Sequence, residues 1–203
     1  GNYDFTLGFR NAFSYKNLSM SVLVDMKFGA DVYSMSKMQS HVNGTSKETL
    51  EGREGWYASE QARLSANVDA KDWTPTGGYV GKGVKAVTDA DGNVSYVPND
   101  VYVDPAKYWQ ALQNSSPEPF ICDNSFVKLR EVSLSYSCPK KWFVHTPIES
   151  VTLSAYGRNL LLIYSKVDNI DPESSYNNGN GQGFEYGSLP SRRTFGFGIN
   201  VKF

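Results

Sequence analysis

Long hydrophobic runs are missing from this sequence of 203 residues. The longest, Leu160 to Ile163, falls far short of the roughly 20 apolar residues that a membrane-spanning helix needs. Hydropathy alone would therefore suggest a soluble protein, but strands that cross a membrane alternate in polarity and give only a weak hydropathy signal. A signal peptide and an initiating methionine are also missing, because Gly1 leads directly into a strand pattern. We expect the chain to be processed or to be a piece of a longer one.

An excess of either charge is absent as well. The 20 Lys and Arg residues balance 21 Asp and Glu residues, for a formal net charge of -1. We therefore expect no nucleic acid as a partner. Cysteine is scarce: Cys122 and Cys138 flank one predicted strand, and about 16 extended residues span roughly 50 Å. A disulfide needs Cα atoms within about 7 Å, so we predict no disulfide between them.

Patterns for catalysis are not found: the sequence has no Gly-x-Ser-x-Gly, no Cys–His pairing and no phosphate-binding glycine loop. His41 and His145 fall in connections at opposite ends of the predicted strands and cannot share a metal ion. We expect no enzyme, no cofactor and no metal site.

Two acidic segments could hold a cation, but another interpretation is favoured for each. Asp89 to Asn93 resembles the opening of a calcium loop, yet it lacks the Gly and the Glu that an EF-hand needs at fixed positions, so a hairpin turn is favoured. Asp168, Asp171 and Glu173 are interpreted as solvated acids rather than cation ligands.

Glycine and aromatic residues are, by contrast, abundant: 18 Gly, 13 Tyr and 11 Phe, which favours strands and loops over helices. The last ten residues alternate strictly, with apolar side chains at odd positions and small or polar ones at even positions. A strand that ends on a bare aromatic residue is typical of bacterial outer-membrane barrels. The apolar face of this predicted barrel-closing strand is Phe195, Phe197, Ile199, Val201 and Phe203.

The same alternation predicts an all-β fold, an antiparallel transmembrane β-barrel segment. Connections between the strands are alternately short and long, as in barrels with short periplasmic turns and long extracellular loops. With Phe203 on the periplasmic side, the two long connections lie outside the cell. Five strands are too few to close a barrel, so we expect missing upstream strands. The expected strands are about 2–13, 18–33, 125–137, 150–164 and 192–203, and the expected extracellular loops are about 36–124 and 165–191.

Aromatic residues fall near the predicted strand ends, where the aromatic girdles of a barrel lie. We expect four at the periplasmic turns and two at the outer ends. They are Phe13, Tyr15, Trp142 and Phe143 for the turns, and Tyr33 and Tyr164 for the outer ends.

The first long loop is predicted to have structure of its own. Residues 84–97 read as a hairpin, Asp104 as the cap of a short helix, and residues 56–64 as a second helix. The aromatic residues of this loop could contact substrate or a lid protein, although a small core of the loop itself is favoured. These candidates are Trp56, Tyr57, Trp73, Tyr79, Tyr108 and Trp109.

Three charged residues, Lys128, Arg130 and Glu131, lie in one predicted strand and could line the lumen. Strict alternation would instead place Lys128 and Arg130 on the face of Val132 and Leu134, which is the lipid face lower down the strand. Near the extracellular end these two residues could reach lipid headgroups or an outer loop. A structural role is favoured over substrate contact.

Several blocks resemble the C-terminal region of the SusC/RagA family of TonB-dependent outer-membrane transporters of Bacteroidota. These blocks are residues 103–109, 123–136, 139–140, 157–160, 171–173 and 190–195. The resemblance covers essentially the whole chain and implies the last five strands of a 22-stranded barrel with an N-terminal plug. It also implies import of oligosaccharides or peptides under a SusD-like lipoprotein lid, powered through TonB. Cys122, Cys138 and the Asn- and Gly-rich stretch 177–183 are small departures from the pattern in loops and turns. Because loops vary across the family, the resemblance leaves the substrate class open.

Two other functions fit parts of the sequence. A soluble β-sandwich that binds glycans would explain the alternation and the aromatic residues, but not the order of short and long connections. A β-rich hydrolase is disfavoured because no catalytic arrangement is present.

Overall fold

The computed structural model describes residues 2–174, 179, 181 and 183–203. The chain forms two compact units. The first unit contains the N-terminal segment up to Ser34 together with Ile121–Phe203, and the second is Met35–Phe120.

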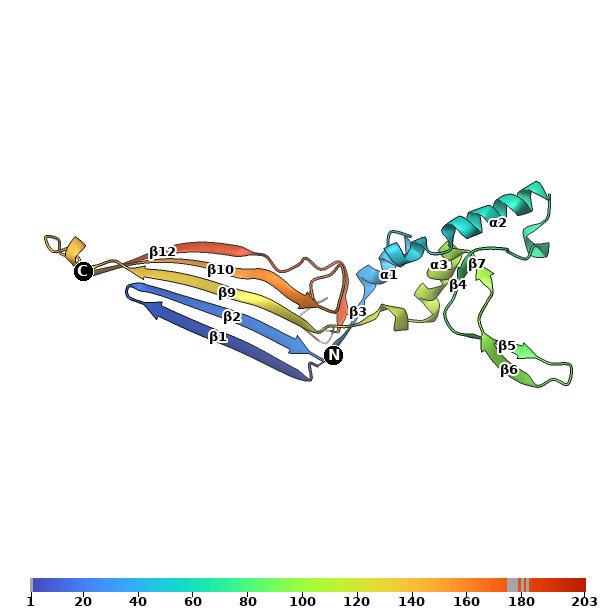
Figure 1. Cartoon of the computed structure of the whole chain (residues 1–203), viewed down its shortest axis with the longest axis horizontal. Coiled ribbons are helices and arrows are strands. Elements are labelled where there is room, and N and C mark those ends of the chain that lie inside the picture. The colour runs from blue at the N-terminus through green and yellow to red at the C-terminus, as the bar shows by residue number, and fades with distance from the viewer. Residues whose placement is uncertain (1, 175–178, 180, 182) are drawn as a thin grey trace. The chain divides into compact units, whose positions relative to one another are not determined.

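The first unit is built on a five-stranded antiparallel sheet with the order β1-β2-β9-β10-β12 (Figure 1). The prediction of antiparallel strands is confirmed. Each strand is long enough to cross an outer membrane when tilted, which takes about 9–11 residues, and β10 is longer still at 16 residues. The strands are β1 Phe5–Tyr15, β2 Leu18–Phe28, β9 Phe126–Ser137, β10 Ser150–Ser165 and β12 Thr194–Lys202.

The alternation of the sequence becomes two chemically different faces of this sheet, because successive side chains in a strand point to opposite sides. Across β1 and β2, Phe9 pairs with Val24 on one face while Gly8 pairs with Asp25 on the other. At the other edge of the sheet, Ala155 of β10 pairs with Phe197 of β12 on the apolar face.

A β-bulge interrupts the alternation in β9. Leu23 and Val24 of β2 are consecutive, but their partners Glu131 and Leu129 are not, so Arg130 is an extra residue. The neighbouring β10 compensates with its own irregularity between Arg158 and Leu161. An extra residue reverses which side chains point to each face of the strand beyond it. From Leu129 towards the N-terminal end of β9, the odd residues therefore continue the apolar face.

The second long strand ends earlier than the expected residue 33. Gly29 follows β2 with a φ of 86°, and a Cβ at this position would collide with the side chain of Asp4. Only glycine fits such a left-handed and crowded position. The chain then enters a separate three-stranded sheet of β3 (Asp31–Ser34), β8 (Ile121–Asp123) and β11 (Phe184–Glu185).

Two short connections lie at the end of the long sheet that also holds the C-terminus (Figure 1). A tight turn at Lys16 and Asn17 joins β1 to β2, with Lys16 at φ 51°. The connection from β9 to β10 contains the short 3-10 helix η4, Lys140–Trp142. The two long connections leave from the opposite end, so short and long connections alternate as the sequence predicts.

The second unit confirms the three elements predicted inside the first long loop. The hairpin forms from β5 and β6, and Asp104 caps α3 by accepting a hydrogen bond from the Ala106 N–H at 2.9 Å. The second predicted helix is α2. The elements of the unit are α1 Met35–Val42, η1 Lys47–Leu50, α2 Arg53–Ser65, η2 Ala70–Asp72, β4 Tyr79–Val80, β5 Val84–Thr88, β6 Val94–Pro98, β7 Tyr102–Val103, α3 Pro105–Ser115 and η3 Glu118–Phe120.

No helix among the described residues is long and apolar enough to cross a membrane. The prediction that no disulfide joins Cys122 and Cys138 is confirmed.

One glycine of β12 leaves room for an aromatic side chain on the polar face. Tyr156 of β10 pairs with Gly196, and a Cβ there would overlap the tyrosine ring. We expect Gly196→Val to destabilise the fold by about 1–3 kcal/mol, the usual cost of overpacking. Urea unfolding in detergent micelles would measure this change. Adding Tyr156→Ala should recover most of the loss, and an undiminished loss in the double variant would contradict this contact.

Candidate functional site

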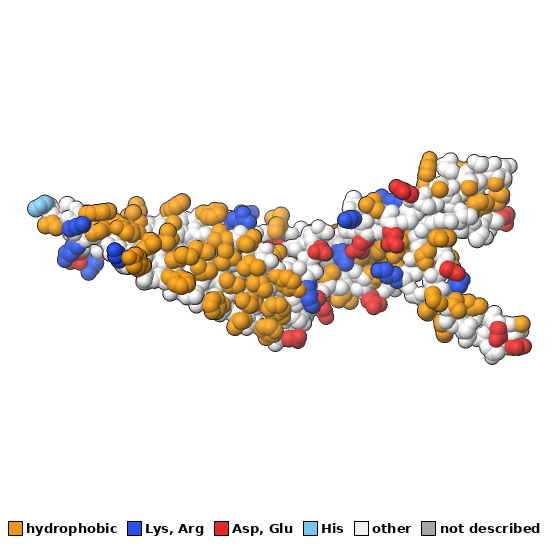
Figure 2. Space-filling view, viewed as in Figure 1, with side chains coloured by type: hydrophobic (Ala, Val, Ile, Leu, Met, Phe, Trp, Pro, Cys, Tyr) orange, Lys and Arg blue, Asp and Glu red, His pale blue; other side chains and the backbone are white. Residues whose placement is uncertain are grey.

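The apolar face of the long sheet is an extended hydrophobic surface that is exposed in the first unit. Figure 2 shows hydrophobic side chains covering the visible face of this sheet. At the β12 edge, Phe197 is 87% exposed and Ile199 is 73% exposed. The exposed apolar side chains of this face include Phe5, Leu7, Phe9, Phe13, Tyr15, Leu18, Met20, Leu134, Leu153, Phe195, Phe197, Ile199, Val201 and Phe203.

Such a face is unfavourable in water, since soluble proteins rarely expose contiguous apolar patches larger than a few hundred Å². The described residues provide no second sheet of similar size to cover it, because the remaining sheets have two or three strands. The opposite face carries Asp25, Ser133, Ser135, Thr152 and Asn200, which suit an aqueous environment. One apolar and one polar face on strands of this length are the features of a transmembrane β-barrel wall.

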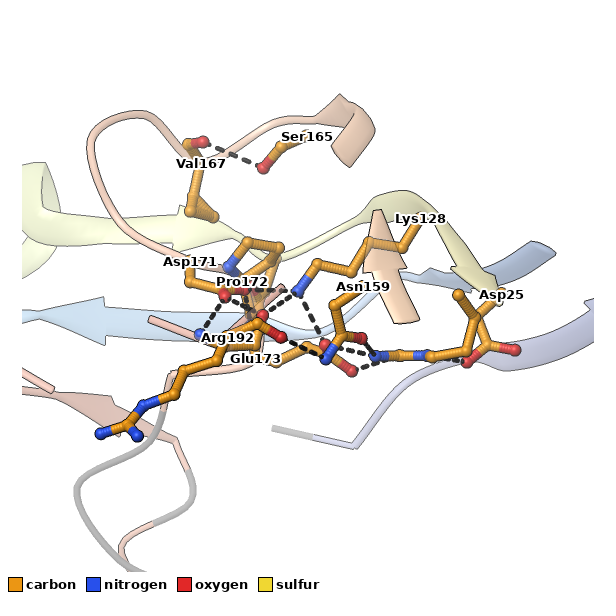
Figure 3. A network of polar contacts seen from close by, with 12 residues as sticks. Asp25, Lys128, Asn159, Ser165, Val167, Asp171, Pro172, Glu173 and Arg192 are labelled. Carbon is orange, nitrogen blue, oxygen red and sulfur yellow. Dashed lines mark hydrogen bonds and ion pairs between the residues drawn. The ribbon is translucent and has the colours of Figure 1, made fainter. Parts of the chain in front are cut away.

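Near the end of the polar face from which the long connections leave, a cluster of ionic side chains joins β9 to the loop that follows β10 (Figure 3). Lys128 is only 4% exposed. Its Nζ donates to Asp171 Oδ1 at 2.8 Å and to Glu173 Oε2 at 2.7 Å. It also donates to Ser191 Oγ at 2.8 Å, so the ammonium holds two separate parts of the loop.

Arg130, the extra residue of the β9 bulge, extends the cluster across the sheet. Its guanidinium donates to Asp25 of β2 at 2.6 Å, to Asn159 of β10 at 2.7 Å and to Glu173 at 2.5 Å and 2.9 Å. A guanidinium is suited to this role because it presents several donors in a rigid fork. The cluster therefore connects three adjacent strands to one loop.

The electrostatics of the two loop carboxylates agree with this geometry. Burial tends to raise the pKa of Asp171, but hydrogen bonds from Lys128 and Ser191 outweigh burial and lower it to about 2. Burial also opposes ionisation of Glu173, and hydrogen bonds from Arg130 and Lys128 hold its pKa below its usual range. Both carboxylates are therefore charged partners of the cations at neutral pH.

Two expectations from the sequence are wrong here. Lys128 and Arg130 were expected to share the face of Val132 and Leu134, but the bulge places them with Asp25 on the polar face. Asp171 and Glu173 were expected to be solvated acids, but both accept hydrogen bonds from these cations. The structural role favoured for the cations agrees with this network.

The cluster predicts a pH dependence for the anchoring of the loop. A carboxylate whose pKa is lowered by folding stabilises the folded state above its ordinary pKa, and this stabilisation is lost as the pH falls through the folded value. For Asp171 the loss extends from 3.8 down to about 2. A spin label introduced by Leu189→Cys, with Cys122→Ser and Cys138→Ser, should be immobile at neutral pH and mobile at pH values below this range. The same label with Lys128→Met should be mobile at every pH, and a pH-independent signal in both proteins would contradict the anchoring.

Glu131 and Asp168 lie outside this cluster. Glu131 accepts a hydrogen bond from Arg158 Nε at 2.8 Å. Asn159, Ser191 and Asp25 are cluster members that the sequence did not single out. The sequence did show two acids on either side of Pro172 and two basic residues, Lys128 and Arg130, in one strand. Pairing these acids with these bases required knowing where the bulge lies in β9.

The aromatic candidates of the second unit lie in three different settings. Tyr79 and Trp109 are buried, and with Tyr108 their ring centroids lie 4.6 to 5.7 Å apart, so these three form a core as favoured from the sequence. Trp73 donates through Nε1 to Ser59 Oγ of α2 at 3.1 Å. Trp56 and Tyr57 instead lie on α2 and line a cavity.

Residues 89–93 form a hairpin turn, as the sequence favours. The Asp89 carboxylate accepts from the N–H groups of Asp91 and Asn93 at 3.0 and 2.8 Å. His41 is buried and bonds to Glu48 at 2.9 Å and to the Lys37 carbonyl at 2.8 Å. No group of three or more potential metal ligands occurs in the part of the chain that the structure describes.

Comparisons with known proteins agree with the features of a barrel wall that the long sheet shows. No family model matches the chain. TonB-dependent receptor P3 of Formosa agariphila is 27% identical over 206 residues, which is 98% of this chain and 16% of the receptor. TonB-dependent receptor P26 of the same organism is 28% identical over 205 residues, which is 98% of this chain and 17% of the receptor. The chain therefore spans about one sixth of the length of these relatives.

Solved structures show the same fold. The RagAB peptide importer in its closed-closed state matches 98% of this chain and 17% of its own, with a TM-score of 0.58 and 18% identity. The RagAB peptide transporter matches 97% of this chain and 17% of its own, with a TM-score of 0.54 and 18% identity. The resemblance to the SusC/RagA type is thus confirmed: the chain is similar, over nearly its full length, to a segment of TonB-dependent receptors.

Proposed function

We propose that the chain is the C-terminal part of a TonB-dependent nutrient importer of the SusC type in a bacterial outer membrane. In this proposal β1, β2, β9, β10 and β12 are the last five strands of a 22-stranded barrel. The mechanism is binding and gated passage, with no bond chemistry and no cofactor. The named relatives are receptors and transporters rather than enzymes, which supports this reading.

The exposed apolar face of the long sheet is the observation that carries the proposal. In a bilayer, this face contacts hydrocarbon, and the polar face lines the lumen. The backbone groups at both open edges, β1 and β12, would be paired by further strands, because an open edge in lipid leaves hydrogen-bonding groups unsatisfied. In this arrangement Phe195, Phe197, Ile199, Val201 and Phe203 form the lipid face of the barrel-closing strand.

The order of the connections supports one orientation of the strands in the membrane. Short connections at one end fit the periplasm, and the long connections fit the cell exterior. Figure 2 shows Lys and Arg side chains gathered at the end of the sheet with the short connections. Trp142, 59% exposed, and Tyr15, 72% exposed, lie at this same end and fit an aromatic girdle. The second unit, within Met35–Phe120, would then be extracellular.

The partners of the complete importer follow from the same assignment. We expect a SusD-like lipoprotein as a lid, the TonB complex acting through an N-terminal part, and an oligosaccharide or a peptide as substrate. One of the similar structures is the RagAB peptide importer, which supports keeping peptides among the candidate substrates. The ionic cluster would hold the last extracellular loop against the barrel wall.

A soluble glycan-binding sandwich remains the competing function. It requires a second large sheet against the apolar face of the first, and the described residues contain none. A soluble module would stay folded and in solution without detergent, whereas a barrel segment would depend on detergent.

Fractionation of cells tests the proposal. An antibody to residues 36–124 should detect a band far larger than 22.6 kDa, confined to the outer membrane and shifted in mobility by boiling. A soluble band near that mass with no shift would overturn the importer and favour the binding module.

A further inference from the structure

The two short connections of the long sheet lie next to each other. One is the turn at Lys16 and Asn17, and the other is the connection from β9 to β10, which contains η4. They are in direct contact, because the Asn17 carbonyl accepts a hydrogen bond from the Ser137 N–H at 2.8 Å. Residues 15–17 and 138–149 therefore contribute to one surface, which we call the turn surface.

The turn surface has an excess of positive charge. Lys16, Lys140 and Lys141 are exposed, and none of them forms an ion pair with another described residue. Glu149 is the only acidic residue of the two connections, and it is paired with Lys202 at 2.8 Å. Figure 2 shows the basic side chains gathered at this end of the sheet. Three ammonium groups therefore have no anionic partner within the described part of the chain.

Large apolar side chains accompany these lysines. Tyr15, Trp142 and Val144 are all well exposed, Val144 at 68%. The Lys16 ammonium lies 5.3 Å from the centre of the Tyr15 ring. Tyr15 is the last residue of β1 and belongs to the apolar face of the long sheet, so the turn surface continues that face. Exposed apolar groups beside unpaired lysines match a membrane boundary, where charged headgroups adjoin hydrocarbon.

We propose that the turn surface binds the headgroups of anionic phospholipids in the periplasmic leaflet of the membrane. A lysine ammonium is a compact charge with three donors, which suits the phosphate oxygens of mobile headgroups. Trp142 and Val144 would enter the boundary with the hydrocarbon. An acidic protein would match the lysines equally well, but it would not account for the continuity with the apolar face. This inference rests on the proposed function, which places this end of the sheet at the periplasm.

Fluorescence quenching beside the turn surface tests the inference on the complete protein in lipid vesicles. A fluorophore attached through Val144→Cys, in a background without other cysteines, reports only the lipids close to it. The vesicles contain equal parts of phosphatidylglycerol, which is anionic, and phosphatidylcholine, which has the same phosphate but no net charge. One of the two lipids carries bromine as the quencher. We expect phosphatidylglycerol to be preferred about tenfold or more at this site, since each lysine near an anionic surface contributes about fivefold.

Two triple variants locate the source of this preference. The first replaces the three lysines of the turn surface with glutamine and should bring the preference close to one. The second removes the same charge from exposed lysines of the second unit and should leave the preference unchanged. The first variant is Lys16→Gln, Lys140→Gln and Lys141→Gln, and the control is Lys47→Gln, Lys82→Gln and Lys107→Gln.

Equal quenching by the two lipids in the unmodified surface would overturn the headgroup site, and this comparison needs no variant. A preference that persists without the three lysines would also overturn it. So would a preference that inorganic phosphate or an acidic peptide abolishes, when sodium chloride of the same ionic strength does not. The importer assignment survives these failures if the barrel band still shifts on boiling. Absence of quenching by either lipid would instead count against the membrane boundary and the importer together.

Discussion

Arginine in place of Ile199 should destabilise the folded protein by about 2–4 kcal/mol, while arginine at the adjacent Asn200 should have little effect. The apolar face would bring the Ile199→Arg guanidinium into hydrocarbon near the middle of β12, where a basic side chain has about this cost. Ile199 is 73% exposed, so no protein packing is lost that would explain a large effect. Urea unfolding in lipid vesicles, followed by tryptophan fluorescence, measures both variants.

The neighbouring position is a strict control, because both residues lie in the same strand at nearly the same depth. Ile199 pairs with Leu153, and Asn200 pairs with Thr152 on the polar face. The two positions are therefore closely matched in strand propensity and in their pairing with β10. If both arginine variants unfold at the wild-type urea concentration, the apolar face does not contact lipid.

Lys128→Met should cost about 3–5 kcal/mol, since it removes one partner of a buried ionic group. The variant leaves Asp171, whose side chain is 9% exposed, and Glu173 without the ammonium that both share. The temperature at which the heat-unfolded form appears on a semi-native gel should fall. The loop after β10 should also become sensitive to protease.

A surface lysine supplies the control for that variant. Lys166 bonds to Asp123 at 2.5 Å, but the side chains are 51% and 38% exposed. Exposed pairs contribute only about 0–1 kcal/mol, so Lys166→Met should leave the gel transition nearly unchanged. Equal effects of the two methionine variants would show that burial of the cluster does not determine its contribution.

Much of the fold was accessible from local sequence. The alternation in the last ten residues predicts β12 and its two faces, because side-chain direction in a strand depends only on position along it. Asp104 followed by Pro105 predicts the start of α3, because capping is also a local property. The hairpin at residues 84–97 follows from its turn residues in the same way.

The ionic cluster could not be predicted in this manner. Its geometry depends on one bulged residue, Arg130. The only local sign of the bulge is a break in the alternation, where Arg130 and Glu131 are consecutive polar residues, and such a break does not show which residue is the extra one. The partners of Lys128 lie 43 and 45 residues further along the chain, in a loop whose path is set by tertiary contacts. The cavity of the second unit was missed for a related reason, since three helices must first come together to form it.

Spin labels along β12 test most directly whether this sheet is a barrel wall. Single cysteines at residues 195–201, with Cys122→Ser and Cys138→Ser, would be labelled in lipid vesicles and relaxed by oxygen or by a water-soluble nickel chelate. We predict that oxygen accessibility peaks at Phe195, Phe197, Ile199 and Val201, and that the nickel chelate reaches the even positions between them. High nickel accessibility at the odd positions, or no alternation along the strand, would contradict a membrane-facing sheet.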